Sequence, residues 1–349
     1  MVTIKEVAKK SGVSPSTVSR VIADNPRIGE QTKKKVRKIM KELGYHPNVH
    51  ARNLVAKSTK AIGVIMPSSA NKALQNPFFP EVLRGISSEI HKEKYSMILS
   101  TGETEKEIFD EVKRLVYGSY VDGVILLYSR MNDPITTFLN EENFPFVLVG
   151  KPHEHMDSIT HVDNDNYLAG KELTNVLIEQ QHKKIAFIGG ADDLFVTMDR
   201  QAGYVAALKE AGLEVIPEYK VHTEFLESGG KSAVEKLISL KDKPTGIIVS
   251  DDLIGLGVLG MLGEHGFRVP QDVSLASFNN VYFSEITSPP LTTVDINIFE
   301  LGIQSARALI EKTINKDEPA KRIIISHSIK HRSSVEKLNE LSLNKNSNR

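Results

Sequence analysis

The chain has 349 residues, with 44 basic and 44 acidic side chains, and its formal net charge at pH 7 is zero. It contains no cysteine, which excludes disulfides, cysteine-ligated zinc and thiol catalysis. No apolar leader follows Met1 and no apolar run approaches the ~20 residues that span a membrane, so we expect a soluble, cytoplasmic protein with no membrane partner. The length allows two or three domains.

The neutral total hides a strongly basic N-terminal segment. Residues 1–60 contain 14 Lys and Arg against 4 Asp and Glu, whereas the rest of the chain contains 30 against 40. Scattered surface lysines do not explain such a separation over one contiguous segment. The pattern indicates that the head alone binds a polyanion and that the body does not.

The segment TIKEVAKKSGVSPSTVSRVI predicts two short helices joined by a tight turn. Thr3 and Glu6 form a capping box ahead of the first helix, and Gly12 supplies the turn. Ser14 then offers an N-cap oxygen, and Pro15 suits the first helical position, where no amide hydrogen is needed. An ordinary helical hairpin is the alternative, which this density of caps and turn disfavours.

The second of these helices has one apolar and one polar face. Val18, Val21 and Ile22 follow one another at helical spacing and are expected to face inward. The polar side carries small hydroxyls and one guanidinium, from Ser16, Thr17, Ser19 and Arg20. Such side chains can read base edges in the major groove, so the segment is interpreted as a helix-turn-helix that binds double-stranded DNA.

Two further helices are predicted between the helix-turn-helix and the body. Residues 32–43 form an amphipathic helix that ends at Gly44. A shorter helix could begin at Pro47, but it is too short to be stable alone in water. Its Leu54, beside Arg52, has the character of an apolar wedge for a minor-groove step. A plain interdomain linker remains the alternative.

From residue 61 onward, apolar strands alternate with amphipathic helices. Continuous apolar runs of this kind are typical of parallel strands covered on both faces. The expected strands lie at 61–67, 96–102, 121–128 and 144–150, and again at 183–190, 245–251 and 273–278. Two similar halves predict a two-lobed α/β body with a ligand cleft at the carboxyl ends of the strands.

These segments carry a family resemblance. The whole chain resembles the lactose-repressor (LacI) family of bacterial transcription regulators, over about 330 residues in order and at family spacing. Beyond the helix-turn-helix, the resemblance rests on GYHPNVHARNL, NPFFPEVLRGI, HVDNDNYLAGKEL, RQAGYVAAL, GFRVPQDVSLASFNN and PPLTTVDINIFELG. Within the family, the chain is most similar to repressors of maltose operons.

The resemblance implies an all-α head and a periplasmic-binding-protein-like body of two doubly wound subdomains joined by three crossovers. The expected divisions are a helix-turn-helix domain at 1–46, a hinge helix at 47–60, a body at 61–339 and a tail at 340–349. The N-subdomain is expected to take residues 61–161 plus 292–321, and the C-subdomain 162–291 plus 322–339. The polar tail is too short for a tetramerising coiled coil, so a homodimer is expected.

The resemblance also implies the site residues. It places the DNA contacts on Ser14, Pro15, Ser16, Thr17, Arg20, Arg52 and Leu54. Because Pro15 has no backbone N–H to donate, Ser16 and Arg20 are expected to do most of the base reading. It places the contacts to a sugar effector on Phe78, Phe79, Arg200, Phe225 and Asp252. A guanidinium and a carboxylate can share paired hydroxyls, and an aromatic ring can stack on the apolar face of a sugar.

Two departures from the family pattern bear on the cleft. Asn279 stands where an acid is usual, which is expected to alter the chemistry of the cleft or of an interface. Residues 70–75 lengthen the segment before NPFF and could line or roof the pocket, with room for a disaccharide or longer sugar.

The expected function is therefore repression of a sugar-utilisation operon, relieved by a maltose-type inducer, without a cofactor or enzymatic activity. In the main alternative, a phosphorylated partner or phosphosugar acts as a co-repressor and strengthens DNA binding. A sugar-transport protein or a sugar-modifying enzyme would leave the basic head unexplained. The segment GLGVLG at 255–260 formally matches a dinucleotide motif, but a lone match is weak. A metal could be suggested by His153, His155 and His161 with Asp157 and Asp163, but their spacing is not a recurrent ligand pattern.

Overall fold

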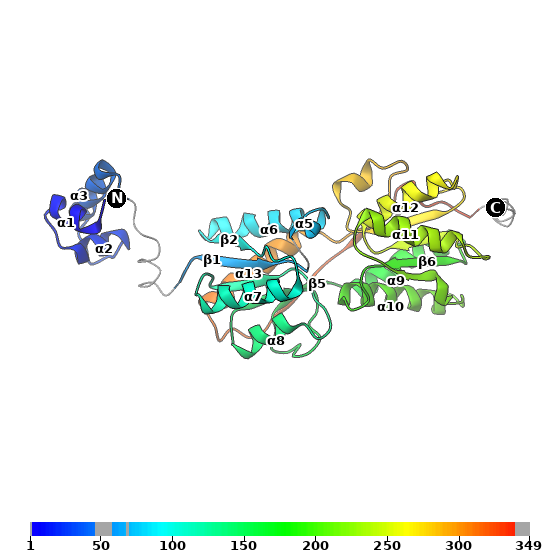
Figure 1. Ribbon diagram of the computed structural model, residues 1–349, viewed down its shortest axis with the longest axis horizontal. Coiled ribbons are helices and arrows are strands. Elements are labelled where there is room, and N and C mark those ends of the chain that lie inside the picture. The colour runs from blue at the N-terminus through cyan, green and yellow to red at the C-terminus, as the bar shows by residue number, and fades with distance from the viewer. Residues whose placement is uncertain (1, 46–57, 68–69, 339–349) are drawn as a thin grey trace. The chain divides into compact units, whose positions relative to one another are not determined.

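The computed structural model describes residues 2–45, 58–67 and 70–338, and the chain divides into two compact units, Met1–Thr59 and Lys60–Arg349 (Figure 1). We describe each unit by itself. The expected hinge helix, with Arg52 and Leu54, and the expected tail fall outside the described residues.

The head is a three-helix unit whose helices begin and end as the sequence indicates. Its helices are α1 (Ile4–Ser11), α2 (Pro15–Ile22) and α3 (Glu30–Leu43). The Thr3–Glu6 capping box is present, and Gly12 ends α1 with a φ of 68°. All three helices pack on a small core of Val7, Ala8, Val18, Val21, Val36 and Ile39.

The described part of the body holds two six-stranded sheets. The first has the strand order β11-β5-β4-β3-β1-β2 and the second has β12-β10-β9-β8-β6-β7. The first sheet contains β1 (Ala61–Ile65), β2 (Ser96–Leu99), β3 (Gly123–Leu126), β4 (Phe146–Val149), β5 (His161–Asn164) and β11 (Arg322–Ile325). The second contains β6 (Ile185–Gly189), β7 (Lys220–His222), β8 (Gly246–Val249), β9 (Ser274–Phe278), β10 (Thr292–Asp295) and β12 (Ser328–Lys330). Only β12 pairs antiparallel among these strands, with β10.

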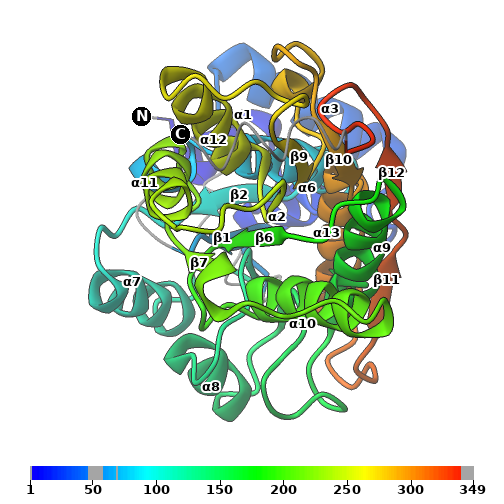
Figure 2. The ribbon, with the colours of Figure 1, turned by 90° about the vertical axis from the view of Figure 1, so that its right-hand side faces the viewer.

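Helices cover both faces of each sheet, which explains why the strands are apolar throughout (Figures 1 and 2). In the first subdomain α6 (Phe78–Lys92) packs with α13 (Ile298–Ile314), and α7 (Glu105–Tyr117) packs with α8 (Pro134–Glu141). In the second, α9 (Asn166–Glu179) packs with α10 (Phe195–Glu210), and α11 (Glu227–Ile238) packs with α12 (Asp252–Glu264). A short helix, α5 (Ala70–Ala73), precedes α6.

Close glycine contacts let these helices cross at short distance. A Cβ added to Gly85 of α6 would lie 2.2 Å from the carbonyl oxygen of Phe299. On α12, a Cβ added to Gly257 would lie 2.0 Å from the carbonyl oxygen of Glu227. The GLGVLG segment is therefore a helix-packing motif, and the Asp251 side chain already caps this helix by accepting from the Leu253 N–H at 2.7 Å. The dinucleotide alternative is wrong for this segment.

The strand order corrects the expected subdomain boundaries. Strand β5 was expected at the start of the C-subdomain, but it pairs with β4 and β11 in the first sheet. Strand β10 was expected in the N-subdomain, but it pairs with β9 in the second sheet. Strand β11 was expected in the C-subdomain, but it pairs with β5 in the first sheet. The chain therefore crosses between the subdomains after β5, after β10 and after β11. Apolar pattern locates a strand but does not say which sheet supplies its neighbours.

Candidate functional site

The start of α2 presents polar side chains on the surface of the head. Ser14, Pro15, Ser16 and Arg20 are exposed, and Thr17 is partly exposed. The hydroxyl of Ser14 accepts from the Thr17 N–H at 3.1 Å and lies 2.7 Å from the Ser16 hydroxyl. Ser14 therefore caps the helix, while Ser16 and Arg20 remain accessible to a ligand of this face.

Charged side chains of α3 divide into paired and outward-facing ones. Lys33 is buried and binds both Asp24 at 3.0 Å and Glu30 at 3.2 Å, and Arg37 also binds Asp24. These ion pairs fix α3 against the turn that follows α2. Exposed Lys34 and Lys38 lie on the same helix and add to the positive charge of the head.

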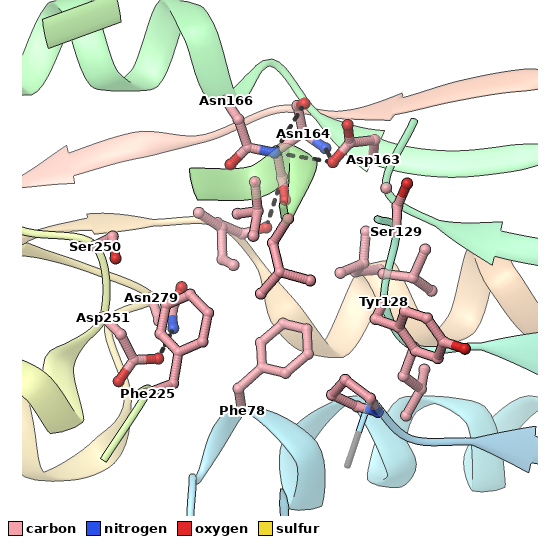
Figure 3. A pocket seen from close by; sticks show the side chains of 18 of the residues that line it. Phe78, Tyr128, Ser129, Asp163, Asn164, Asn166, Phe225, Ser250, Asp251 and Asn279 are labelled. Carbon is pink, nitrogen blue, oxygen red and sulfur yellow. Dashed lines mark hydrogen bonds between the residues drawn. The ribbon is translucent and has the colours of Figure 1, made fainter. Parts of the chain in front are cut away.

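A cavity of about 120 Å³ lies between the two subdomains of the body, beyond the carboxyl ends of the strands (Figure 3). Its walls come from both sheets and from the crossovers between them. The polar lining residues include Asn76, Tyr128, Ser129, Asp163, Asn164, Asn166, Arg200, Ser250, Asp251 and Asn279. The apolar ones include Pro67, Phe78, Phe79, Leu127, Val149, Leu194, Val196, Phe225, Ile296 and Leu301. Parallel α/β sheets place ligands at this edge.

Arg200 is buried in the polar wall and held in a fixed orientation. Its Nε donates to Oδ1 of Asn166 at 2.9 Å, and its Nη1 donates to the carbonyl oxygen of Ser250 at 2.6 Å. The guanidinium also stacks over the ring of Phe278, with 4.2 Å to the ring centroid. Burial lowers the pKa of Arg200 to about 10, so the group still carries its charge at neutral pH.

Asp251 is an acidic residue of the cavity lining, and it accepts hydrogen bonds from side chains of both subdomains. Its Oδ2 accepts from the amide of Asn76 at 2.9 Å and from the amide of Asn279 at 2.7 Å. Figure 3 shows Asp251, Asn279 and Phe225 close together on one side of the pocket. Burial raises the pKa of Asp251 to about 6, and the hydrogen bonds it accepts limit that rise.

The structure corrects the predicted role of Asp252, which does not line the cavity. Asp252 is fully buried and accepts from the hydroxyls of Ser277 and Thr293 and from the N–H of Val281. The two acids are neighbours in sequence, but Asp251 is the N-cap residue of α12 and Asp252 is its first helical residue. Their side chains therefore point in different directions. Sequence spacing alone could not choose between them.

Asp163 is a further acidic residue of the lining that the sequence analysis missed. Its Oδ1 accepts from the amide of Asn166 at 2.9 Å, and burial raises its pKa to about 7. The segment HVDNDN contains β5 and the start of α9, with Asp163 near the carboxyl end of the strand and Asn166 just beyond it, so the rule that ligands bind at strand ends could have found them.

The cavity is also lined by aromatic rings, which come from both subdomains. Phe78 and Phe79 meet edge to face with 5.2 Å between ring centroids, and Figure 3 shows Phe78 and Phe225 pointing into the same space. A Cβ added to Gly190 would lie 2.3 Å from the Phe225 ring, so this glycine makes room for it. The structure thus brings together Phe78, Phe79, Arg200 and Phe225 as the sequence predicts. Residues 72–75 do not line the cavity, so the proposed role for that part of the inserted segment is not direct contact.

Two polar atoms of the lining have no hydrogen-bond partner within the described residues. They are the hydroxyl of Ser250 and Oδ1 of Asn279, and both are buried. Buried polar groups nearly always find partners, and an unpaired one costs about 1 to 3 kcal/mol. The Ser250 hydroxyl can therefore donate to or accept from a hydroxyl of a bound molecule, and Oδ1 of Asn279 can accept from one.

The geometry matches what the comparisons with known proteins find. Residues 3–48 match the family model for bacterial regulatory proteins of the lacI family, and residues 174–335 match a periplasmic binding protein-like domain. The regulator MalR of Streptococcus pneumoniae serotype 4 is 41% identical over 343 residues, which is 95% of this chain and 98% of the relative. The chain belongs to the LacI family of bacterial regulatory proteins. It is a DNA-binding transcriptional regulator with a helix-turn-helix head and a two-subdomain α/β body.

Solved structures support the same assignment. A protein from Bacillus cereus subsp. cytotoxis named as a transcriptional regulator LacI is 54% identical, with a TM-score of 0.79 over 80% of this chain and 99% of that one. A "probable maltose operon transcriptional repressor" from Staphylococcus aureus is 32% identical, with a TM-score of 0.73 over 79% of this chain and 98% of that one. In the part of the chain that the structure describes, every helix is too short or too polar to cross a lipid bilayer.

Proposed function

We propose that this LacI-family regulator is a repressor of a sugar-utilisation operon that leaves its operator when a neutral sugar occupies the cavity. The observation that carries the proposal is that buried Arg200 and Asp251 line one cavity together with the rings of Phe78 and Phe225. A sugar presents hydroxyls on its edges and C–H groups on its faces, so it complements both the charged and the aromatic side chains.

The charge of the lining favours a neutral sugar over a phosphorylated one. Among the described lining residues, the carboxylates of Asp163 and Asp251 face a single guanidinium, that of Arg200. A phosphate in this space would add about two negative charges beside two acidic side chains, of which Asp251, with a pKa of about 6, is mostly ionised at pH 7. This arrangement argues against a phosphosugar as co-repressor. A phosphorylated partner protein that binds another surface is the other form of this alternative, and the experiment below tests for it.

Maltose or a maltodextrin is the first candidate for the sugar. The similarity to the Staphylococcus aureus protein and to MalR of Streptococcus pneumoniae supports this choice. Two subdomain walls with both stacking rings and hydrogen-bonding groups also suit a molecule with more than one sugar ring.

The proposed DNA complex is a homodimer on a pseudo-palindromic, double-stranded operator in the cytoplasm. Each α2 would enter the major groove, and Arg52 and Leu54 would contact the minor groove at the centre of the site. Exposed apolar side chains near the end of β9, Tyr282 and Ile286, are 75% and 76% exposed and offer a surface for the second copy. Replacing Leu54 with Ala should weaken operator binding much more than non-specific binding; equal weakening would contradict the wedge.

The experiment that tests the function is operator binding by fluorescence anisotropy, with maltose, maltotriose, glucose and glucose 6-phosphate added in turn. Release by maltose or maltotriose alone supports an inducible maltose regulator. Tighter binding with the phosphosugar, or no response until a phosphorylated partner protein is added, would instead support a co-repressor mechanism.

A further inference from the structure

Asn76 reaches across the cleft from the first subdomain to the second. It lies just before α6, and its Oδ1 accepts from the N–H of Phe78 at 3.0 Å. Its Nδ2 donates to Oδ2 of Asp251 at 2.9 Å and approaches the carbonyl oxygen of Phe225 at 3.5 Å. One side chain therefore caps a helix of one subdomain and binds a carboxylate of the other.

This contact is buried, unlike the ion pairs that cross the cleft near it. Asn76 and Asp251 are each 4% exposed. On the same rim, the side chains of Lys72 and Glu224, whose ion pair is 3.6 Å long, are 58% and 67% exposed. Exposed ion pairs contribute little because water screens them, whereas a buried hydrogen bond to a charged group contributes substantially.

The opposite rim also has contacts between the subdomains, and they are more accessible to water. Lys151 binds Asp199 at 2.6 Å, and the Arg130 Nε lies 3.6 Å from Asp193. The Lys151 side chain is 35% exposed and the Asp193 side chain is 45% exposed. Among these side-chain contacts between described residues, the Asn76–Asp251 hydrogen bond is the one with both partners almost fully buried.

Asp251 is also the carboxylate that a bound sugar would meet. Its Oδ2 already accepts two amide N–H groups, from Asn76 and from Asn279, while Oδ1 accepts from the Leu253 N–H. A sugar hydroxyl that binds Oδ2 must share this atom with two donors. The donor from the other subdomain is the one that can leave without disturbing the fold of its own sheet.

We propose that the hydrogen bond between Asn76 and Asp251 is a latch that holds the two subdomains together without effector, and that a sugar hydroxyl bound to Asp251 displaces Asn76. The displacement rests on the proposed function; the latch does not. The side-chain oxygen of Asn76 accepts from the first N–H of α6, so Asn76 moves with that helix. Once the side-chain nitrogen of Asn76 leaves Asp251, α6 and the sheet that it covers can move relative to the second subdomain. The chain from the head enters that sheet at β1, so this movement can reach the DNA-binding unit.

The test measures the separation of the subdomains directly. The chain has no cysteine, so Asp110→Cys in α7 and Lys236→Cys in α11, both exposed, can be labelled for single-molecule energy transfer. Doubly labelled chains are diluted into unlabelled protein so that each assembly carries one labelled chain. The variant is Asn76→Ser, which keeps an oxygen acceptor for the Phe78 N–H but cannot reach Asp251. Lys72→Ala, which breaks the exposed ion pair on the same rim, is the control.

Without sugar or DNA, we expect Asn76→Ser to raise the ratio of separated to closed subdomains about tenfold and Lys72→Ala to leave it unchanged. A distribution identical to wild type in Asn76→Ser would overturn the latch, whatever the sugar does. Saturating maltose should shift the wild-type distribution away from the one without sugar, because a sugar that displaces Asn76 replaces this hydrogen bond with its own contacts to the two subdomains. If another sugar produces that shift, maltose is the wrong effector and the latch stands; if the sugar that releases operator DNA leaves the distribution unchanged, the displacement is overturned.

Discussion

The side-chain amide of Asn164 donates to the carbonyl oxygen of Ile325 at 2.9 Å, and the same nitrogen donates to the carbonyl oxygen of Ile296 at 3.0 Å. These residues lie on different crossovers: Asn164 ends β5, Ile296 follows β10 and Ile325 ends β11. A single buried amide therefore ties together the three segments about which the subdomains must turn. Asn164 also lines the cavity, so the hinge and the ligand site share a residue.

Replacing Asn164 with Ala should destabilise the body strongly. Ile296 and Ile325 are buried, so their carbonyl groups would lose a donor without gaining water. We expect the free energy of unfolding to fall by about 2 to 4 kcal/mol, measured by urea denaturation. Asn175→Ala on α9, where no side-chain hydrogen bond is formed among the described residues, is the matched control. Equal stability of the two variants would show that the crossovers do not depend on this amide.

The neighbouring acids Asp251 and Asp252 should separate effector binding from stability. Asp251→Asn keeps the shape of a cavity residue and one oxygen that can still accept from Asn76 and Asn279, so the free energy of unfolding should fall by only about 1 kcal/mol. Removing the carboxylate from the sugar site should weaken the response to effector about tenfold or more, measured as the sugar concentration that half-releases operator DNA.

Asp252→Asn should show the reverse. Its new amide would face the hydroxyls and N–H group that now donate to the carboxylate, so the free energy of unfolding should fall by about 2 kcal/mol. The folded fraction should keep its effector response. If Asp252→Asn lost its response to effector but kept normal stability, Asp252 would have to be a residue of the effector site.

Much of this architecture follows from patterns in the sequence, and the exceptions have a common cause. The cap at Thr3, the turn at Gly12 and the apolar strands depend on local chemistry, which single residues and spacings report. Which sheet β5 or β10 joins depends on strands far away in the chain. Which of Asp251 and Asp252 lines the cavity also depends on distant residues. The role of Asn76 is of the same kind, because its partner lies 175 residues later.

Base reading by the head should depend on Arg20 more than on the lysines of α3. Arg20 is exposed on α2, where a guanidinium can bind a guanine edge with two hydrogen bonds. Arg20→Ala should weaken operator binding by about 1 to 3 kcal/mol and binding to random DNA much less. Lys34→Ala on α3 removes the same charge and should weaken both equally. Anisotropy titrations on both DNAs at one salt concentration compare the variants, and equal losses for Arg20→Ala would exclude base reading by this residue.

The buried acids should make stability depend on pH in an unusual direction. Burial raises the pKa of Asp252 to about 7, whereas the ordinary value is 3.8. Between these values the folded state binds more protons than the unfolded state, so this group's contribution to stability is greatest at low pH and is lost as pH rises through about 7. Buried His161 and His182 have lowered pKa values and act in the opposite direction, so wild type alone cannot isolate the effect.

The difference in unfolding free energy between wild type and Asp252→Asn removes the histidine contribution, because both proteins contain the same histidines. We expect wild type to be more stable than the variant by a larger margin at pH 5.5 than at pH 8, with most of the change below about pH 7 and little above it. Urea denaturation at steps across this range measures it. A margin that stays constant across this range would mean that Asp252 is charged in the folded protein throughout, held so by its three hydrogen-bond donors rather than neutralised by burial.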